Sequence, residues 1–190
     1  AQGRLRAYDK TDITAEVQGM MLPTLEKRFK IGTRYAKDEI MIDIDNAESR
    51  LALKSQKAQL HTAITAMMPD MKIDMPTSFS NWKAYLDKFD VNQPIRPFPK
   101  HLSEREEYYV STKNLHSQFY NIKSAEVRLE KFQVKAPFDG ILTAANVNEG
   151  GFVRAGISLG TLMNTATYEM EAAVQVADLS YIKRGSSVKV

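Results

Sequence analysis

One short β pattern occurs twice in this chain, and a long helical pattern separates the two copies. The first copy covers residues 29–41 and the second covers residues 147–159. Their positions match in character when Gly32 is aligned with Gly150: Tyr35 with Val153, Met41 with Leu159, and Asp38 with Gly156. Two half-motifs of this kind must meet in space. The pattern therefore predicts a small β module from which a helical hairpin projects.

Tight turns within each half need residues that tolerate a left-handed backbone or the absence of a side chain. Glycine does so freely, and aspartate does so better than most other residues. The structural turn positions predicted on this basis are Gly32, Asp38, Gly140, Gly150 and Gly156.

Composition excludes several classes of function. The chain has 190 residues, no cysteine and a formal net charge of +3. The absence of cysteine removes disulfides, thiolate metal sites and a cysteine nucleophile. The charge is small and the basic residues are dispersed, so nucleic acid is not an expected partner. No apolar run approaches the ~20 residues that a membrane-spanning helix needs.

The first β half is predicted over residues 12–45, after an edge or membrane-proximal segment over residues 1–11. Short apolar runs and alternation place strands in it: Ile13–Val17, Met20–Leu25, Arg28–Ile31 and Glu39–Ile44.

The hairpin is predicted over residues 46–132, and its outgoing helix over 46–67. Asp45 and Glu48 have the spacing of a capping box, and Pro69 is expected to end the helix. The apolar stripe of this helix contains Ala47, Leu51, Ala58, Leu60, Ile64 and Met67, with Leu53, Leu60 and Met67 repeating every seven residues.

The return helix is predicted over residues 103–131, with Ser103 and Glu106 as its capping box. A heptad repeat typical of a coiled-coil seam runs along it: Tyr108, Leu115, Ile122 and Leu129. An outgoing and a return helix fit an antiparallel hairpin.

Residues 68–102, between these helices, are too many for a simple turn. Phe79, Trp82, Leu86 and Phe89 fall on one face of a short helix. Three prolines within residues 93–99 exclude helix and strand pairing and favour an extended path. The tip of the hairpin is therefore predicted to carry a small folded cap.

The second β half is predicted over residues 133–164, and residues 165–190 are predicted to begin another β domain. Residues 169–176 alternate as a strand does, and Val188–Val190 read as a further strand that is cut off as it begins. We therefore expect the sequence to be part of a longer protein.

These segments resemble bacterial membrane fusion proteins, the periplasmic adaptor subunits of tripartite efflux pumps and haemolysin-type secretion. Residues 135–141, 147–150, 153–156 and 159–160 are similar to the second lipoyl half-motif of that family. Residues 29–45 resemble its first half-motif. Residues 178–185 resemble the opening of its β-barrel domain.

The resemblance implies an elongated α+β fold: a lipoyl-like β-sandwich built from two distant halves, an α-helical coiled-coil hairpin inserted between them, and the start of a β-barrel. It implies a periplasmic protein anchored to the inner membrane by a segment outside this chain. The implied partners are an inner-membrane transporter, with the resistance-nodulation-division (RND) type favoured, and an outer-membrane exit-duct protein. The implied assembly is a ring, hexameric in the complex, and the protein has no chemistry of its own. An adaptor of a type I secretion system or an ABC-type exporter is the alternative.

Three observations depart from the family. Asp38 stands where glycine is usual, and the tip lacks the Arg, Leu and Ser pattern that some adaptors carry for the duct. The proline-rich and aromatic tip also differs from a plain hairpin turn. A lipoyl-type carrier, finally, would need a modifiable lysine on a tight turn between the halves, where this chain has its helical insertion.

No catalytic residue, cofactor site or metal site is predicted. His61, His101 and His116 lack the spacing of metal ligands. Asp43, Asp45 and Glu48 are explained by a strand end followed by a helix cap.

Two groups near the tip allow a second interpretation. Met67, Met68, Met71 and Met75 could bind copper(I) or silver(I) in a periplasmic metal- or ligand-binding module, although methionine more often fills apolar gaps. Trp82, Leu86 and Phe89 could contact the exit duct or pack onto their own hairpin, and the second is favoured.

Overall fold

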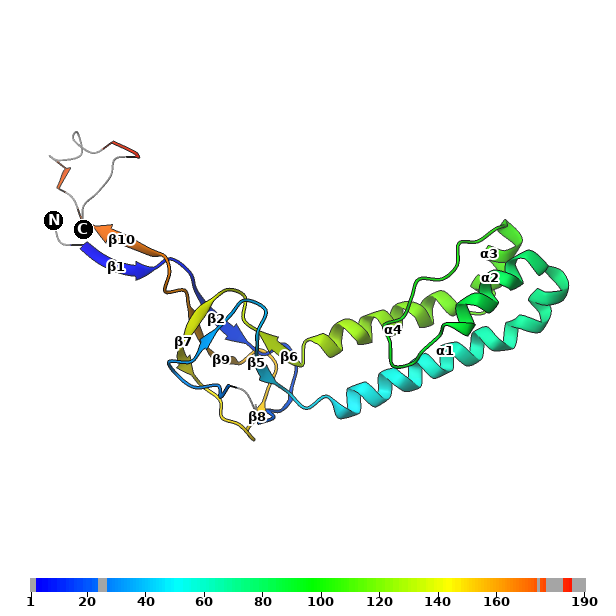
Figure 1. The fold of residues 1–190 in the computed structure, drawn as a ribbon, viewed down its shortest axis with the longest axis horizontal. Coiled ribbons are helices and arrows are strands. Elements are labelled where there is room, and N and C mark those ends of the chain that lie inside the picture. The colour runs from blue at the N-terminus through cyan, green and yellow to red at the C-terminus, as the bar shows by residue number, and fades with distance from the viewer. Residues whose placement is uncertain (1–2, 24–26, 174, 177–182, 186–190) are drawn as a thin grey trace.

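The computed structural model describes residues 3–23, 27–173, 175–176 and 183–185 as an elongated molecule (Figure 1). A small β module lies in the middle, a helical hairpin projects from one side of it, and a two-stranded ribbon projects from the other. Four helices and several antiparallel strand pairs make up these parts. The predicted α+β class is confirmed.

The β module is made from strands of both sequence halves. The first half supplies β2 (Lys10–Thr14), β3 (Gly19–Met20), β4 (Arg34–Tyr35) and β5 (Ile40–Asp43). The second half supplies β6 (Gln133–Lys135), β7 (Gly140–Ala145), β8 (Phe152–Val153) and β9 (Ser158–Met163). One sheet has the order β2-β9-β7-β4, and the pairs β3-β8 and β5-β6 join the halves again. The two distant segments therefore meet, as the repeated pattern predicts.

Two details of the strand prediction are wrong. Residues 28–31 form no strand. The strand predicted at Ile13–Val17 lies three residues earlier, and those predicted at Met20–Leu25 and Glu39–Ile44 are shorter than predicted. Phe29 instead sends a buried side chain into the core from an irregular segment. Ile31, two residues further on, is 68% exposed, so the short apolar run reflects one buried side chain rather than a strand.

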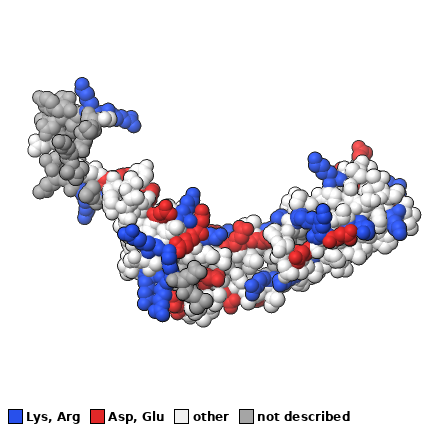
Figure 2. Space-filling model, in the orientation of Figure 1, with Lys and Arg blue, Asp and Glu red and all other residues white. Residues whose placement is uncertain are grey.

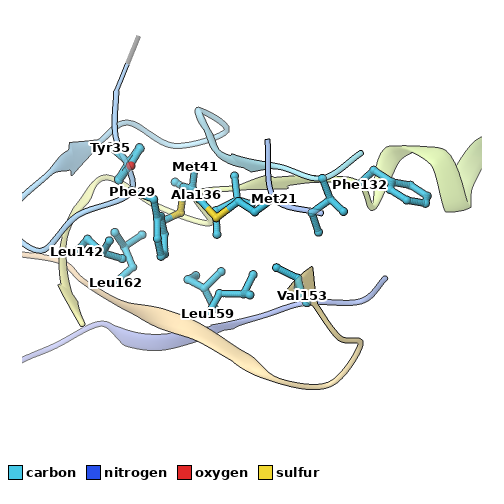
Figure 3. Close-up of a cluster of buried hydrophobic side chains, with 14 of the residues drawn as sticks. Met21, Phe29, Tyr35, Met41, Phe132, Ala136, Leu142, Val153, Leu159 and Leu162 are labelled. Carbon is cyan, nitrogen blue, oxygen red and sulfur yellow. The ribbon is translucent and has the colours of Figure 1, made fainter. Parts of the chain in front are cut away.

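The core of the β module is apolar and is shared by the two halves (Figure 3). Met21 and Met41 come from the first half, and Leu142, Leu159 and Leu162 come from the second, all with at most 1% of their surface exposed. Burying such side chains contributes roughly 1.5–3 kcal/mol each. Neither half can bury these residues alone, so each half stabilises the other.

A ribbon of β1 (Gly3–Ala7) and β10 (Tyr168–Ala172) leaves the module on the side opposite to the hairpin (Figure 1). The two strands pair antiparallel from Gly3 opposite Ala172 to Ala7 opposite Tyr168. The predicted strand at Val188–Val190 lies outside the described residues, as do residues 178–182 of the segment that resembles a barrel opening.

Helix α1 (Ala47–Asp74) does not end before Pro69 as predicted but continues through it. A proline inside a helix costs about 3 kcal/mol because it removes a backbone donor and crowds the preceding turn. Met67 and Met71 lie on either side of it and are both fully buried. Their burial offsets a cost of that size, so packing prevails over the local signal.

The buried side of α1 follows a 4-3 spacing that the predicted stripe only partly captured. Its buried residues are Leu53, Lys57, Leu60, Ile64, Met67 and Met71. Leu51, which was assigned to the apolar stripe, is 66% exposed. At its start, Asp45 accepts a hydrogen bond from the Ala47 amide at 3.0 Å, while the capping position belongs to Asn46.

The cap is more extensive than a turn. Helix α2 (Pro76–Asp87) runs back along the hairpin, and residues 90–99, which we call the strap, return toward the tip without regular secondary structure (Figure 1). Helices α3 (Glu104–Thr112) and α4 (Leu115–Glu130) then lead back to the β module.

The predicted continuous return helix over 103–131 is wrong, because the chain breaks between α3 and α4. Asn114 adopts a left-handed conformation with φ of 55°, which asparagine tolerates better than most residues. Leu115 and Ile122 keep their predicted places in the seam and are buried. Tyr108, on the other side of the break, is 72% exposed, because the break changes which face of α3 points inward.

Candidate docking region of the hairpin

The end of the hairpin farthest from the β module carries three exposed apolar side chains. Ile73 is 82% exposed near the end of α1, Leu102 is 53% exposed just before α3, and Tyr108 is 72% exposed within α3. An ion pair between Arg105 and Asp74, 3.4 Å apart, connects α3 to the end of α1. We call Ile73, Leu102 and Tyr108 the tip residues.

A buried carboxylate, Glu106, holds the tip together from inside. Its side chain accepts hydrogen bonds from the Leu102 amide at 2.8 Å, the Ser78 hydroxyl at 2.7 Å and the Trp82 indole at 2.8 Å. Ser103 caps α3 by accepting from the Glu106 amide at 3.2 Å. The predicted capping box is therefore half formed, because the Glu106 carboxylate turns inward to α2.

Burial alone would raise the pKa of Glu106, but the hydrogen bonds from Leu102, Ser78 and Trp82 outweigh it and lower this pKa. The charged form is thus the one that the site stabilises. His101 lies beside it, with Nδ1 3.8 Å from a Glu106 oxygen and without a hydrogen-bond partner. The carboxylate fixes α2 against the start of α3.

A second buried charge lies midway along the hairpin. The Lys57 ammonium of α1 is 2.7 Å from Glu126 of α4 and donates to the Gln93 carbonyl at 2.7 Å. Glu126 also accepts from the Ile95 amide at 2.7 Å and from Lys123 at 3.1 Å. Burial raises the pKa of Glu126, but these partners outweigh it and lower this pKa. The ion pair therefore fastens the strap to both long helices.

Aromatic rings fill the space between these two charged groups. Phe98 of the strap lies 5.3 Å from Trp82, 5.7 Å from Tyr85 and 4.9 Å from Phe119, measured between ring centroids. Tilted and edge-on rings at such distances add about 0.5–1.5 kcal/mol per pair to the effect of burial. The cap is a packed core rather than a loose loop.

The residues proposed as possible duct contacts lie mostly inside this core. Trp82 is fully buried and Leu86 and Phe89 are partly buried, so the side chain of Trp82 has no surface to present to a partner. The favoured alternative, packing onto their own hairpin, describes their position. The exposed apolar surface of the tip comes instead from Ile73, Leu102 and Tyr108. The apolar periodicity did not single out Ile73 or Leu102, and it placed Tyr108 in the buried seam.

The methionines of the tip also belong to the core. Met67 and Met71 are fully buried in α1, and Met68 and Met75 pack against the same cluster from partly buried positions. Among the residues that the structure describes, no group of three or more His, Cys, Asp or Glu side chains is placed to hold a metal ion.

The structure brings two of the three histidines together and leaves the third apart. His101 and His116 lie together with ring centroids 5.9 Å apart, whereas His61 contacts Phe89. Asp43 has one buried oxygen without a partner, and burial followed by the charge of Asp45 raises the pKa of Asp43.

The predicted turn residues lie in the β module. Gly32, Gly150, Gly156 and Asp38 all have positive φ, from 65° at Asp38 to 89° at Gly32. Gly140 is the first residue of β7 rather than a turn, and a side chain there would meet the Met163 carbonyl oxygen at 2.8 Å.

Sequence reasoning missed the buried role of Lys57, Glu106 and Glu126. A signal existed for Lys57, which interrupts an apolar 4-3 spacing between Leu53 and Leu60. Glu106 was explained by a local helix cap, and nothing in the local pattern points to its partners in α2.

Charge on the molecular surface is mixed in sign. Lys and Arg alternate with Asp and Glu along the visible face of the hairpin and the β module (Figure 2). In the described residues, no helix is long and apolar enough to cross a membrane.

Comparisons with known proteins place the fold in a class. No protein-family model matches this sequence, and no curated protein matches it by sequence. A chimeric protein of MacA and MexA, containing the α-hairpin domain of MexA from Pseudomonas aeruginosa, aligns with a TM-score of 0.64 and 14% identity over 94% of this chain and 54% of its own. A candidate efflux transporter from Bacteroides eggerthii aligns with a TM-score of 0.61 and 17% identity over 88% of this chain and 43% of its own.

A membrane fusion protein from Streptococcus pneumoniae aligns with a TM-score of 0.54 and 11% identity, over 95% of this chain and 70% of its own. The chain spans about half the length of the first two structures. At these identities the likeness is one of fold. The predicted resemblance to membrane fusion proteins, which act as adaptors of efflux systems, is confirmed at that level.

Proposed function

We propose that this chain forms the central part of a periplasmic adaptor that links an inner-membrane transporter to an outer-membrane exit duct. One observation carries the proposal: two distant β halves pair with each other around an inserted helical hairpin, in a fold like that of solved membrane fusion proteins. The task of such a chain is mechanical, and it performs no chemistry of its own.

We assign a separate role to each part of the chain. The lipoyl-like β module, residues 12–45 with 133–164, would hold neighbouring copies in register in a ring of six. The hairpin would set reach and select the duct. Residues from 165 onward would begin a β-barrel near the transporter, for which the RND type remains the first candidate. The anchor to the inner membrane would lie outside this chain.

The tip residues are the surface proposed to meet the duct. They are exposed apolar side chains at the end of α1 and in and beside α3, and these elements meet at the end of the hairpin farthest from the β module (Figure 1). Their support is well held, because Glu106 binds the start of α3 to α2 from inside, whereas the exposed Arg105–Asp74 pair adds little. A rigid apolar patch loses little conformational entropy when it is covered.

Photo-cross-linking in the host cell tests the assignment. A photoreactive side chain is placed in the full-length protein at Ile73 or at Leu102, with Leu51 as the matched control. Leu51 is, like Ile73, an exposed aliphatic residue of α1, 66% exposed, but it lies about 33 Å from Ile73 along the helix. We expect the two tip positions, and not Leu51, to cross-link to an outer-membrane protein. Cross-links from the tip only to inner-membrane proteins, or to none, would contradict the proposal.

A further inference from the structure

The strap is held by the hairpin as a peptide ligand is held by a receptor. Side chains of three helices bind successive backbone groups of it. Those contacts are Lys57 Nζ to the Gln93 carbonyl at 2.7 Å, the Ile95 amide to Glu126 at 2.7 Å, and the Tyr85 hydroxyl to the Arg96 carbonyl at 3.0 Å. Contacts of this kind recognise an extended backbone whatever its side chains are.

Two apolar side chains anchor the strap in addition. Ile95 is 5% exposed, and Phe98 inserts among the rings of Trp82, Tyr85 and Phe119. Prolines precede both anchors and restrict the backbone to extended conformations. Aromatic-lined grooves bind proline-rich segments in the same way, because such segments are already extended and lose little entropy.

The strap does not fill the groove in which it lies. A cavity of about 460 Å³ opens on one side of it, with Leu53, Lys57, Pro94 and Leu129 among its lining residues. A second cavity of about 360 Å³ opens toward α2, with Lys57, Phe89 and Arg96 among its lining residues. The strap is thus attached at a few points rather than packed along its length.

The groove keeps its charges paired without the strap. Lys57 and Glu126 contact each other at 2.7 Å, and Lys123 lies 3.1 Å from the other Glu126 oxygen. Removing the strap would therefore expose a neutralised pair rather than an isolated buried charge. The helices that carry the groove are joined by other contacts as well, including the bonds of Glu106.

We propose that the groove between α1, α2 and α4 is a binding site for extended, proline-containing peptide segments, and that the strap is its resident occupant. A partner segment with an apolar residue after a proline would compete with the strap for the same backbone contacts. The site lies midway along the hairpin and includes none of the tip residues. A failure of peptide binding would therefore leave the proposed docking at the tip untouched, and the reverse is also true.

Competition by a peptide tests the proposal. The probe is a fluorescent peptide with the sequence of residues 90–100, and the receptor is the full chain with Ile95→Ala and Phe98→Ala, which weaken its own strap. We expect fluorescence anisotropy to report binding to this variant. Binding to the unaltered chain should be at least about tenfold weaker, because a tethered occupant competes at an effective concentration in the millimolar range.

Matched variants sharpen the test. In the weakened-strap background, Glu126→Gln should reduce peptide affinity at least about tenfold, because a charged acceptor of a backbone amide is lost. Glu104→Gln, an exposed glutamate of α3 that lines neither cavity, should leave the affinity unchanged. A peptide with aspartate in place of the isoleucine should not bind.

Each adverse outcome overturns the proposal. A folded variant that fails to bind 1 mM peptide, or that binds the aspartate peptide equally well, has no such site. Circular dichroism reports folding, and Ile95→Ala alone is the milder variant. If both variants lose the hairpin helices, the strap is an essential part of the core and not a ligand of it.

Discussion

The β module and the distal cap are stabilised in different ways. The core of the β module is apolar, and strands from its two sequence halves are aligned by backbone pairing. The core of the cap contains the buried charges of Lys57 and Glu106 among its aromatic and aliphatic residues. Backbone pairing specifies register in the first, whereas side-chain hydrogen bonds specify the position of α2 and the strap in the second. A segment without strand pairing needs such polar contacts to be held in one place.

The largest effect is expected from Glu106→Ala. Three donors, from Leu102, Ser78 and Trp82, lose their buried acceptor, which should cost about 3–5 kcal/mol of unfolding free energy. Trp82 is the only tryptophan of the chain, so its fluorescence should shift to the red as the cap loosens. Glu107→Ala, at the exposed neighbouring position, is the control. Equal stability of the two variants would remove the contrast between the two cores.

In the β module the expected effect is smaller and has a steric origin. Gly160→Ala would bring a methyl group against the Ala144 carbonyl and within 3.0 Å of the Phe29 ring. We expect a loss of about 1–3 kcal/mol in chemical denaturation, because overpacking displaces neighbours.

Gly156→Ala serves as the companion variant. Nothing lies within 4 Å of its added carbon, but φ is +84°, so only backbone strain of about 1–2 kcal/mol remains. If Gly156→Ala were the more damaging of the two, crowding would not be what limits this core.

Acid should weaken the cap more than the β module, where Glu39, the one carboxylate among the described residues of the module whose pKa is lowered, is screened by solvent. The pKa values of Glu106 and Glu126 are lowered in the folded chain, so their contribution to stability is present above the ordinary value of about 4.3 and is lost as the pH falls below it. The raised pKa of Asp43 has the opposite sign, since folding becomes easier as that carboxyl is protonated.

We expect the melting temperature reported by Trp82 to fall by about 2–4 °C between pH 5 and pH 3. The double variant Glu106→Gln and Glu126→Gln should be less stable at pH 5 and should lose this pH dependence. A slope that persists in the double variant would assign the effect to other carboxylates.

The smallest effect on stability is expected at the tip. Ile73→Ser removes an exposed side chain, so the free energy of unfolding should change by less than about 0.5 kcal/mol. A large loss of stability in thermal denaturation would mean that Ile73 packs against the chain rather than being available to a partner.

The sequence was sufficient for the architecture but not for the interior of the cap. The meeting of the two β halves could be predicted because the turn residues and apolar positions of one half match those of the other. The passage of α1 through Pro69 could not be predicted, because it depends on how Met67 and Met71 pack. The break at Asn114 likewise depends on the tertiary position of α3. Glu106 had a sufficient local explanation as a cap, so its partners in α2 stayed hidden.

Strands β5 and β6 lie side by side, with Ile42 opposite Val134, at the point where the hairpin begins and ends. The chain thus leaves and re-enters the β module at one fixed pair of strands. The structure of the β module does not depend on the length of the hairpin inserted between them. Inserting seven residues into α1 and seven into α4 would lengthen the rod by about 10.5 Å and keep every buried position facing inward. The length of the hairpin can therefore change, by evolution or by engineering, without any change to the β module that carries it.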